Sequence, residues 1–129
     1  MSDPSYALQK SVYDALVASG VASSRVFHRV PQGTPLPYIH IGHDQIITDY
    51  IAGADFNDCT VTIHAFAKAA PELKLIVGLI RNALDRQITL VGFGVHEWGL
   101  ERVEYMTDPD GLTEHAVLEF RYYILASDG

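Results

Sequence analysis

The six histidines are the residues of this chain whose type is best suited to bind a metal ion. His40 and His43 are the closest pair in sequence, and Cys59 and His64 lie five residues apart. Both pairs lie in stretches with a strand pattern, where successive side chains point to opposite faces, so an odd spacing separates the members of each pair. Only a bulge at Gly42 would bring His40 and His43 to one face. We therefore predict no metal site and expect histidines scattered over the surface of a sheet.

Nucleophilic and acid–base catalysis find no support either. The residues around Cys59 resemble no nucleophile motif, and a lone cysteine in a β-run is typical of a small core side chain. Asp55 and Asp58 lie in a polar stretch, without the burial that raises a carboxyl pKa for acid–base work. The run Gly92-Phe-Gly-Val-His96 lacks the lysine and hydroxyl of a phosphate-binding loop. We predict that the chain is not an enzyme and binds no cofactor.

Size and composition indicate one domain that spans residues 1–129. The net charge of −7 argues against a nucleic-acid grip, which needs clustered Lys and Arg, but allows a surface past which DNA slides. A single cysteine permits no internal disulfide and fits a reducing compartment. No run approaches about 18 apolar residues, so we predict no membrane span and no membrane partner. A cytosolic chain, or one assembled from the cytosol into something larger, fits these properties.

Two helices are expected from apolar residues at helical spacing. Asp3 and Pro4 suit the start of the first helix, which has apolar residues every fourth position and which Gly20 ends. Pro71 and Glu72 open the second, whose apolar stripe runs to Leu84. Both helices have one apolar stripe, so each is expected to pack one side against a sheet.

The remaining segments with regular structure read as strands. They are Arg25–His28, Tyr38–Ile41, Cys59–Phe66, Leu90–Met106 and Leu118–Ile124. A proline-rich stretch at 31–37 leads stiffly into the second of them, and the turn residues 108–111 join the last two. This order predicts an α+β fold: an antiparallel-dominated or mixed β-sheet, two α-helices packed on one face and a long C-terminal β-hairpin.

Acidic residues gather between residues 43 and 58, where the strand pattern weakens. They are Asp44, Asp49, Asp55 and Asp58. We interpret this segment as a long excursion or as the mobile end of a hairpin. A structureless stretch of this length is more than a compact domain needs and is usually functional or disordered.

Six blocks, in a fixed order, carry a family resemblance. They are Ala7–Leu16, Arg25–Phe27, Val30–Gly42, Val61–Phe66, Ala83–Leu84 and Asp108–Arg121. In order and spacing they resemble the tail-terminator or tail-completion proteins of long-tailed bacteriophages and gene transfer agents. The proline-rich block and the final hairpin are the most specific of them.

The resemblance implies a structural protein at the head–tail junction of a virion or phage-like particle. Such a protein forms a ring with itself, usually a homo-hexamer, that caps the tail tube and stops its polymerisation. It meets the tail tube protein on one side and the head-side connector or stopper protein on the other, and DNA passes through without specific binding. Two alternatives stay open: another head–tail connector or joining component, and a small cytosolic ligand-binding domain.

Two surfaces are assigned on this basis. We expect the acidic residues Asp44, Asp49, Asp55 and Asp58 to face the channel, where negative charge would keep DNA from binding; the alternative is a solvated loop. We expect the hairpin turn to project toward the tube or a neighbouring subunit. Its residues are Asp108, Pro109, Asp110 and Gly111.

Overall fold

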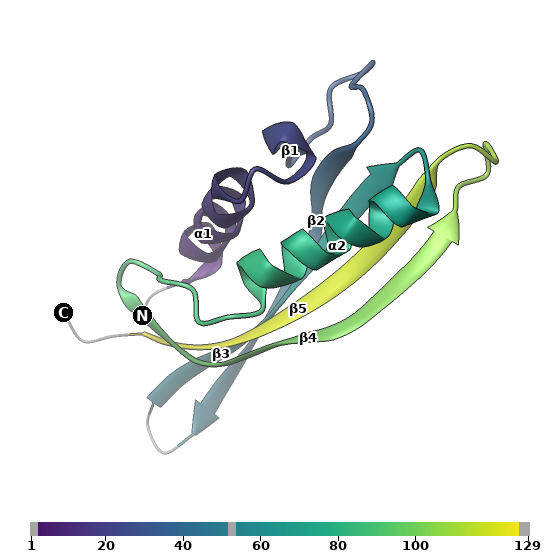
Figure 1. Cartoon of the computed structure of the whole chain (residues 1–129). Coiled ribbons are helices and arrows are strands. Elements are labelled where there is room, and N and C mark those ends of the chain that lie inside the picture. The colour runs from purple at the N-terminus through teal and green to yellow at the C-terminus, as the bar shows by residue number, and fades with distance from the viewer. Residues whose placement is uncertain (1–2, 52–53, 127–129) are drawn as a thin grey trace.

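The computed structural model describes residues 3–51 and 54–126, and for residues 49–51, 54–55 and 126 it describes the backbone alone. The elements are α1 (Ser5–Ala18), the short 3-10 helix η1 (Val21–Ser24), β1 (Val26–Phe27), β2 (Tyr38–Ile51), β3 (Ala54–Ala67), α2 (Ala70–Leu84), β4 (Phe93–Thr107) and β5 (Glu114–Ala126). The five strands form one sheet in the order β1-β2-β3-β5-β4, in which β1 is parallel to β2 and the other pairs are antiparallel. Both helices lie on one face of this sheet (Figure 1). The predicted α+β fold is confirmed, including the long C-terminal hairpin.

Local sequence signals place both ends of α1. The Asp3 carboxylate accepts a hydrogen bond from the backbone N–H of Ser5 at 2.9 Å, which satisfies one of the free donors of the first turn. Gly20 follows the helix with φ near +74°, a left-handed conformation that costs glycine little. The helix buries Leu8 and Leu16 almost completely against the sheet side of the molecule. The helix predicted from residues 3–20 is therefore present.

The second helix is tied to the sheet at its C-terminal end. Pro71 lies in its first turn, and the Glu72 carboxylate accepts a hydrogen bond from the backbone N–H of Lys68 at 3.3 Å. The hydroxyl of Tyr122, a fully buried residue of β5, donates to the carbonyl oxygen of Leu84. That carbonyl is one of the last four of the helix, which have no partner within it. The tyrosine thus fixes where the helix ends over the sheet.

The acidic segment at 43–58 belongs to two paired strands. The register of β2 with β3 shifts between Ile41 and Asp44, so the bulge that the sequence allowed at Gly42 is present. Beyond it the pairing continues from Asp44 with Val61 to Ile51 with Ala54. Of the two interpretations of this segment, the excursion is wrong and the hairpin is right. Alternating side chains on a strand can keep acids in water, so the weak pattern did not mark a loop.

Two further bulges bend the long fourth strand. The pairing of β4 with β5 shifts between Val95 and Glu97 and again between Leu100 and Arg102. These positions follow Gly94 and Gly99, and a glycine inside a strand often marks a bulge. The strand begins at Phe93, three residues later than expected, and Leu90 makes an isolated bridge to Phe93.

The core fills the space between the helices and one face of the sheet. Alternate residues of the central strands β3 and β5 supply much of it, among them Ile63, Leu118 and Phe120, all fully buried. Cys59 is fully buried as well, as expected for a small core side chain, and burial together with nearby aspartates raises the pKa of its thiol to about 12. Within the described part of the chain, neither helix combines the length and the apolar character needed to cross a bilayer.

Candidate functional site on the open face of the sheet

The face of the sheet that carries no helix is called the open face here. Its side chains are the alternate residues of β2, β3 and β5 that point away from the core, such as His64 between the buried Ile63 and Ala65. Two groups of interacting side chains lie on this face, one near each end of the strands. Both groups consist of residue types that ionise or stack, so each is a candidate for function.

Three of the six histidines meet in the first group, which we call the histidine cluster: His40, His64, His115 and the carboxylate of Asp108. Nδ1 of His115 lies 3.0 Å from Oδ1 of Asp108, and Nε2 of His115 lies 2.9 Å from Nδ1 of His64. The rings of His64 and His40 stack with centroids 5.5 Å apart. Nε2 of His40 in turn lies 3.1 Å from the backbone oxygen of His28. The expectation of scattered histidines is wrong for these three.

The register of the sheet explains why the histidines meet. His40 of β2 is directly opposite His64 of β3, and His115 of β5 is opposite Phe66, two residues further along β3. Side chains that are paired or diagonal across neighbouring strands lie within reach of one another. The sequence pattern placed His64 on the polar face of its strand, but only the pairing register shows which residues lie beside it.

Aromatic rings border the histidine cluster and reduce its contact with water. Phe66 stacks on His115 with centroids 4.2 Å apart and on Tyr38 with centroids 4.9 Å apart. Burial, followed by the nearby His115 and His40, lowers the pKa of His64. Burial and the charge of Asp108 raise the pKa of Tyr38. The His64 imidazole is therefore held in a place that disfavours its charged form.

Metal binding is not what this cluster is arranged for. Across residues 3–51 and 54–126, as far as side chains are described, no group of three or more His, Cys, Asp or Glu could hold a metal ion. The facing nitrogens of His64 and His115 bond directly to each other instead. The chemistry that the cluster offers is the uptake and release of protons.

An ion pair forms the second group, toward the other end of the strands. Nε of Arg121 lies 2.7 Å from Oδ1 of Asp58, and its Nη2 lies 3.0 Å from Oδ2. This two-pronged geometry is the strongest that arginine makes with a carboxylate. Because Arg121 pairs with it, Asp58 adds little net negative charge to its surroundings.

Asp44, the other predicted acid whose side chain is described, does not lie beside Asp58. Asp44 is exposed and pairs with Val61, a core residue, whereas Asp58 pairs with Ile47, so the two acids lie on opposite faces of the hairpin. The side chains of Asp49 and Asp55 lie outside the described residues, and their backbones belong to β2 and β3. Asp44 and Asp58 therefore do not form one patch.

The hairpin turn after β4 is held by its own side chains. Oδ1 of Asp110 accepts hydrogen bonds from the backbone N–H groups of Leu112 at 2.8 Å and Thr113 at 2.9 Å, and Oδ2 accepts one from the Thr113 hydroxyl at 2.7 Å. These bonds lower the pKa of Asp110. Gly111 has φ near +70° and donates its N–H to the carbonyl oxygen of Asp108. The turn is a defined structure that projects beyond the helices (Figure 1).

The acidic hairpin and this turn lie at opposite ends of the sheet. Phe56, near the start of β3, pairs with Leu125, whereas Ala67 at its end pairs with Glu114, the first residue of β5. The two ends of the β2–β3 and β4–β5 hairpins point in opposite directions (Figure 1). The sequence could not show this, because it depends on which strands are neighbours.

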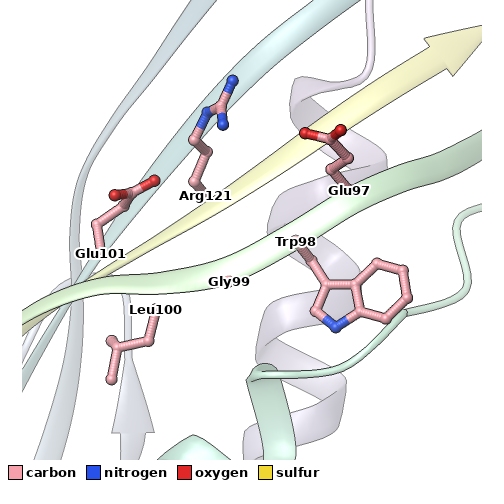
Figure 2. A pocket seen from close by; sticks show the side chains of 6 residues that line it. All are labelled: Glu97, Trp98, Gly99, Leu100, Glu101 and Arg121. Carbon is pink, nitrogen blue, oxygen red and sulfur yellow. The ribbon is translucent and has the colours of Figure 1, made fainter.

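A hollow beside the bends of β4 is lined by side chains that do not point toward one common position. Glu97, Glu101 and Arg121 lie on one side of the strand, and Trp98 and Leu100 lie on the other (Figure 2). Such a divided lining offers no common position for a ligand to contact all of them. The ligand-binding alternative gains no support from this hollow.

The edge of the sheet next to α2 exposes apolar side chains. Trp98 and Tyr105 of β4 are 41% and 44% exposed, and Leu75 of α2 is 74% exposed. The ammonium group of Lys74 lies 5.1 Å from the centroid of the Tyr105 ring. Because β4 is the last strand of the sheet, this edge is available for contact with another molecule.

Fold and surface together define a small α+β protein whose distinctive features are strand ends, an edge and an open sheet face. The family model described as "Tail completion protein gp17" matches residues 8–125. The chain therefore belongs to the family of tail completion protein gp17. This membership confirms the resemblance stated from the sequence blocks and the location expected from it, in the tail of a phage-like particle.

A solved structure supports the same fold. One chain of a structure described as "Virion of native gene transfer agent (GTA) particle" superimposes with a TM-score of 0.85 and 18% identity. The match covers 98% of this chain and 100% of that chain. No curated protein matches the sequence.

Proposed function

We propose that this protein is a structural tail-completion protein that forms a homo-hexameric ring on the end of the tail tube. In this role it stops polymerisation of the tube and joins it to the head-side connector or stopper protein, while DNA passes through the hole. The observation that carries the proposal is the family match over residues 8–125, with a fold shared end to end with a chain of a gene transfer agent virion. The role is structural and requires no catalysis.

The shape of the sheet is suited to a ring. A closed ring uses the same two different surfaces on every subunit, joined head to tail. The exposed edge at β4 and the two-residue strand β1 at the other edge are different surfaces on opposite sides of one sheet. Apolar residues at the β4 edge, Trp98 and Tyr105 among them, are of the types enriched at protein interfaces.

Light scattering across a concentration series tests the ring, and purified tail tubes extend the test. We expect a discrete species of about six times the 14.2 kDa chain, either alone or once tail tubes are added, and ring-shaped density on tube ends by electron microscopy. A tight dimer that neither opens nor binds tubes would contradict the proposal. A ring that binds the connector but not the tube would instead indicate a different joining component.

The acidic hairpin is proposed to face the channel of the ring. The support is its charge: the chain carries −7, and Asp44 is exposed at the end of the sheet opposite the hairpin turn. Replacement of Asp44, Asp49, Asp55 and Asp58 by asparagine should slow or reduce DNA delivery by assembled particles. The matched control neutralises four exposed acids elsewhere, namely Asp85, Glu97, Glu101 and Glu104. Equal delivery by both variants and the parent would show that the hairpin does not line the channel.

The turn at Asp108–Gly111 is proposed to contact the tail tube or a neighbouring subunit. Its support is a fixed shape and a position beyond the helices (Figure 1). A variant with residues 109–112 replaced by a two-residue Asn-Gly turn should fold, since such turns suit antiparallel strands. We expect it to lose tube binding or ring formation. Normal particle assembly by this folded variant would refute the assignment.

A further inference from the structure

We propose that the imidazoles of His64 and His115, with the carboxylate of Asp108, form a proton-sensitive clamp that is closed near neutral pH and opened by acidification. The clamp joins three parts of the open face: β3 through His64, β5 through His115, and the base of the β4–β5 turn through Asp108. It concerns the protein itself and does not depend on the proposed ring.

The hydrogen positions in the closed clamp follow from the three bonded groups. A carboxylate accepts and does not donate, so Nδ1 of His115 donates its proton to Asp108 across 3.0 Å. Between Nε2 of His115 and Nδ1 of His64, 2.9 Å apart, exactly one nitrogen can carry a proton if they are to bond. When both rings are neutral, Nε2 of His115 is the acceptor and Nδ1 of His64 is the donor. Both neutral rings are then in the Nδ1–H form.

The same geometry has room for one extra proton but not for two. One added proton makes His115 an imidazolium, which donates to Asp108 on one side and to Nδ1 of His64 on the other, while the proton of His64 moves from its Nδ1 to its Nε2. A second added proton places hydrogens on both facing nitrogens and a positive charge on both rings at 2.9 Å. Like charges at this distance repel, so the contact between His64 and His115 opens.

Neighbouring groups add to the resistance against the second proton. Titratable side chains around His64 on the open face include His40 and Tyr38 from β2, His115 and Glu119 from β5 and Asp108 from the turn, with Glu104 of β4 in the same row beyond Val117. Glu119 is itself paired with Arg102 of β4 at 3.4 Å. Both helices pack on the other face (Figure 1). Nε2 of His40 donates to the backbone oxygen of His28, and the His40 ring stacks on that of His64. A positive charge on His64 would therefore lie against His40 as well as against His115.

The packing around His64 leaves a space that the size of its ring requires. A Cβ atom on Gly42 would lie 2.8 Å from Cδ2 and 2.9 Å from Nε2 of His64, so the bulge in β2 leaves room for the ring only because residue 42 is glycine. On the other side, Phe66 stacks on His115 and fixes the plane of that ring. His64 and His115 are therefore held in contact by their surroundings as well as by their hydrogen bond.

The direction of the pH effect follows from where the proton binds more easily. In the unfolded chain His64 takes up its proton near the ordinary pKa of about 6.5. In the folded chain burial and the two nearby histidines lower that pKa. Below about pH 6.5 the unfolded chain thus binds more protons than the folded chain, so the free energy of unfolding decreases as the pH is lowered. It levels off once the His64 ring of the folded chain is protonated too.

Nitrogen-15 NMR of the imidazole rings in the intact protein tests the clamp. At pH 9 we expect both His64 and His115 in the Nδ1–H form, and on acidification we expect His64 to titrate below 6.5. Removal of the His115 charge in His115→Gln should raise the pKa of His64. The matched control is His96→Gln, a histidine near Phe56 outside the cluster, which should leave the His64 titration where it was.

Thermal unfolding between pH 7.5 and 5.5 gives a second readout. The wild type should lose more Tm on acidification than His64→Gln, which cannot take up the proton. The proposal is overturned if His64 titrates at or above 6.5, if His115 carries its proton on Nε2 at pH 9, or if His64→Gln loses as much Tm as the wild type. The two wild-type NMR observations decide the matter even where a variant does not fold.

Discussion

Substitution of Gly42 by alanine should destabilise the protein through one side chain, that of His64. The new Cβ would lie 2.8 Å from a ring carbon that needs about 3.4 Å or more, and the ring is not free to swing away, because it bonds to His115 and stacks on His40. Loss of the hydrogen bond costs about 1 kcal/mol and local overpacking about 1–3 kcal/mol. Alanine in place of glycine in a strand returns about 0.5–1 kcal/mol. The expected net loss is about 1–3.5 kcal/mol.

A double-mutant cycle measured by urea unfolding isolates this contact. In the His64→Ala background the added methyl has nothing to strike, so Gly42→Ala should be neutral or slightly stabilising, with a coupling of about 2–4 kcal/mol. Gly78→Ala is the control: it is in α2 with open space around the new methyl, and it should stabilise by about 0.5–1 kcal/mol. An equal cost of Gly42→Ala in both backgrounds would refute the reasoning, because strain in the bulge itself would then be the cause.

Three further predictions concern other parts of the fold. Tyr122→Phe should cost about 1–3 kcal/mol in urea unfolding, because the carbonyl of Leu84 loses its buried donor; Tyr6→Phe at an exposed position should cost nothing measurable. The Cys59 thiol, buried and with its pKa raised to about 12, should react with a thiol reagent at pH 8 only as fast as the protein unfolds, and rapid reaction with the folded protein would contradict its burial. Asp110→Ala should increase backbone amide exchange at Thr113 without change at the far end of β5, and protection left intact would show that the turn does not need the carboxylate.

The sequence carried the parts of the fold that depend on near neighbours. The ends of α1 follow from Asp3 and Gly20, whose effects act within a turn of helix. The sequence allowed a bulge in β2 at Gly42 for a similar reason, because a glycine inside a strand often marks a bulge. Alternation in β3 likewise assigned His64 to the polar face and Cys59 to the core.

What could not be predicted depends on the strand order. His64 and His115 are 51 residues apart in sequence and meet only because β3 and β5 are neighbours with β4 outside them. The same order joins Arg121 to Asp58, so one of the four acids expected to face a channel is paired with a base. Residue types alone gave six histidines and many acids, and pairing across the sheet decides which of them act together.

The lengths of the elements indicate why this protein needs partners. At about 1.5 Å per residue the 15 residues of α2 span roughly 22 Å, whereas the 14 residues of β3 span roughly 46 Å at about 3.3 Å per residue. The helices therefore cover only about half the length of the central strands, and both hairpin ends extend beyond them (Figure 1). Main-chain bonds across β2, β3 and β5 hold the uncovered parts in shape. The strand ends that the helices leave uncovered are accessible to other molecules, and in the assembly that we propose neighbouring proteins cover them.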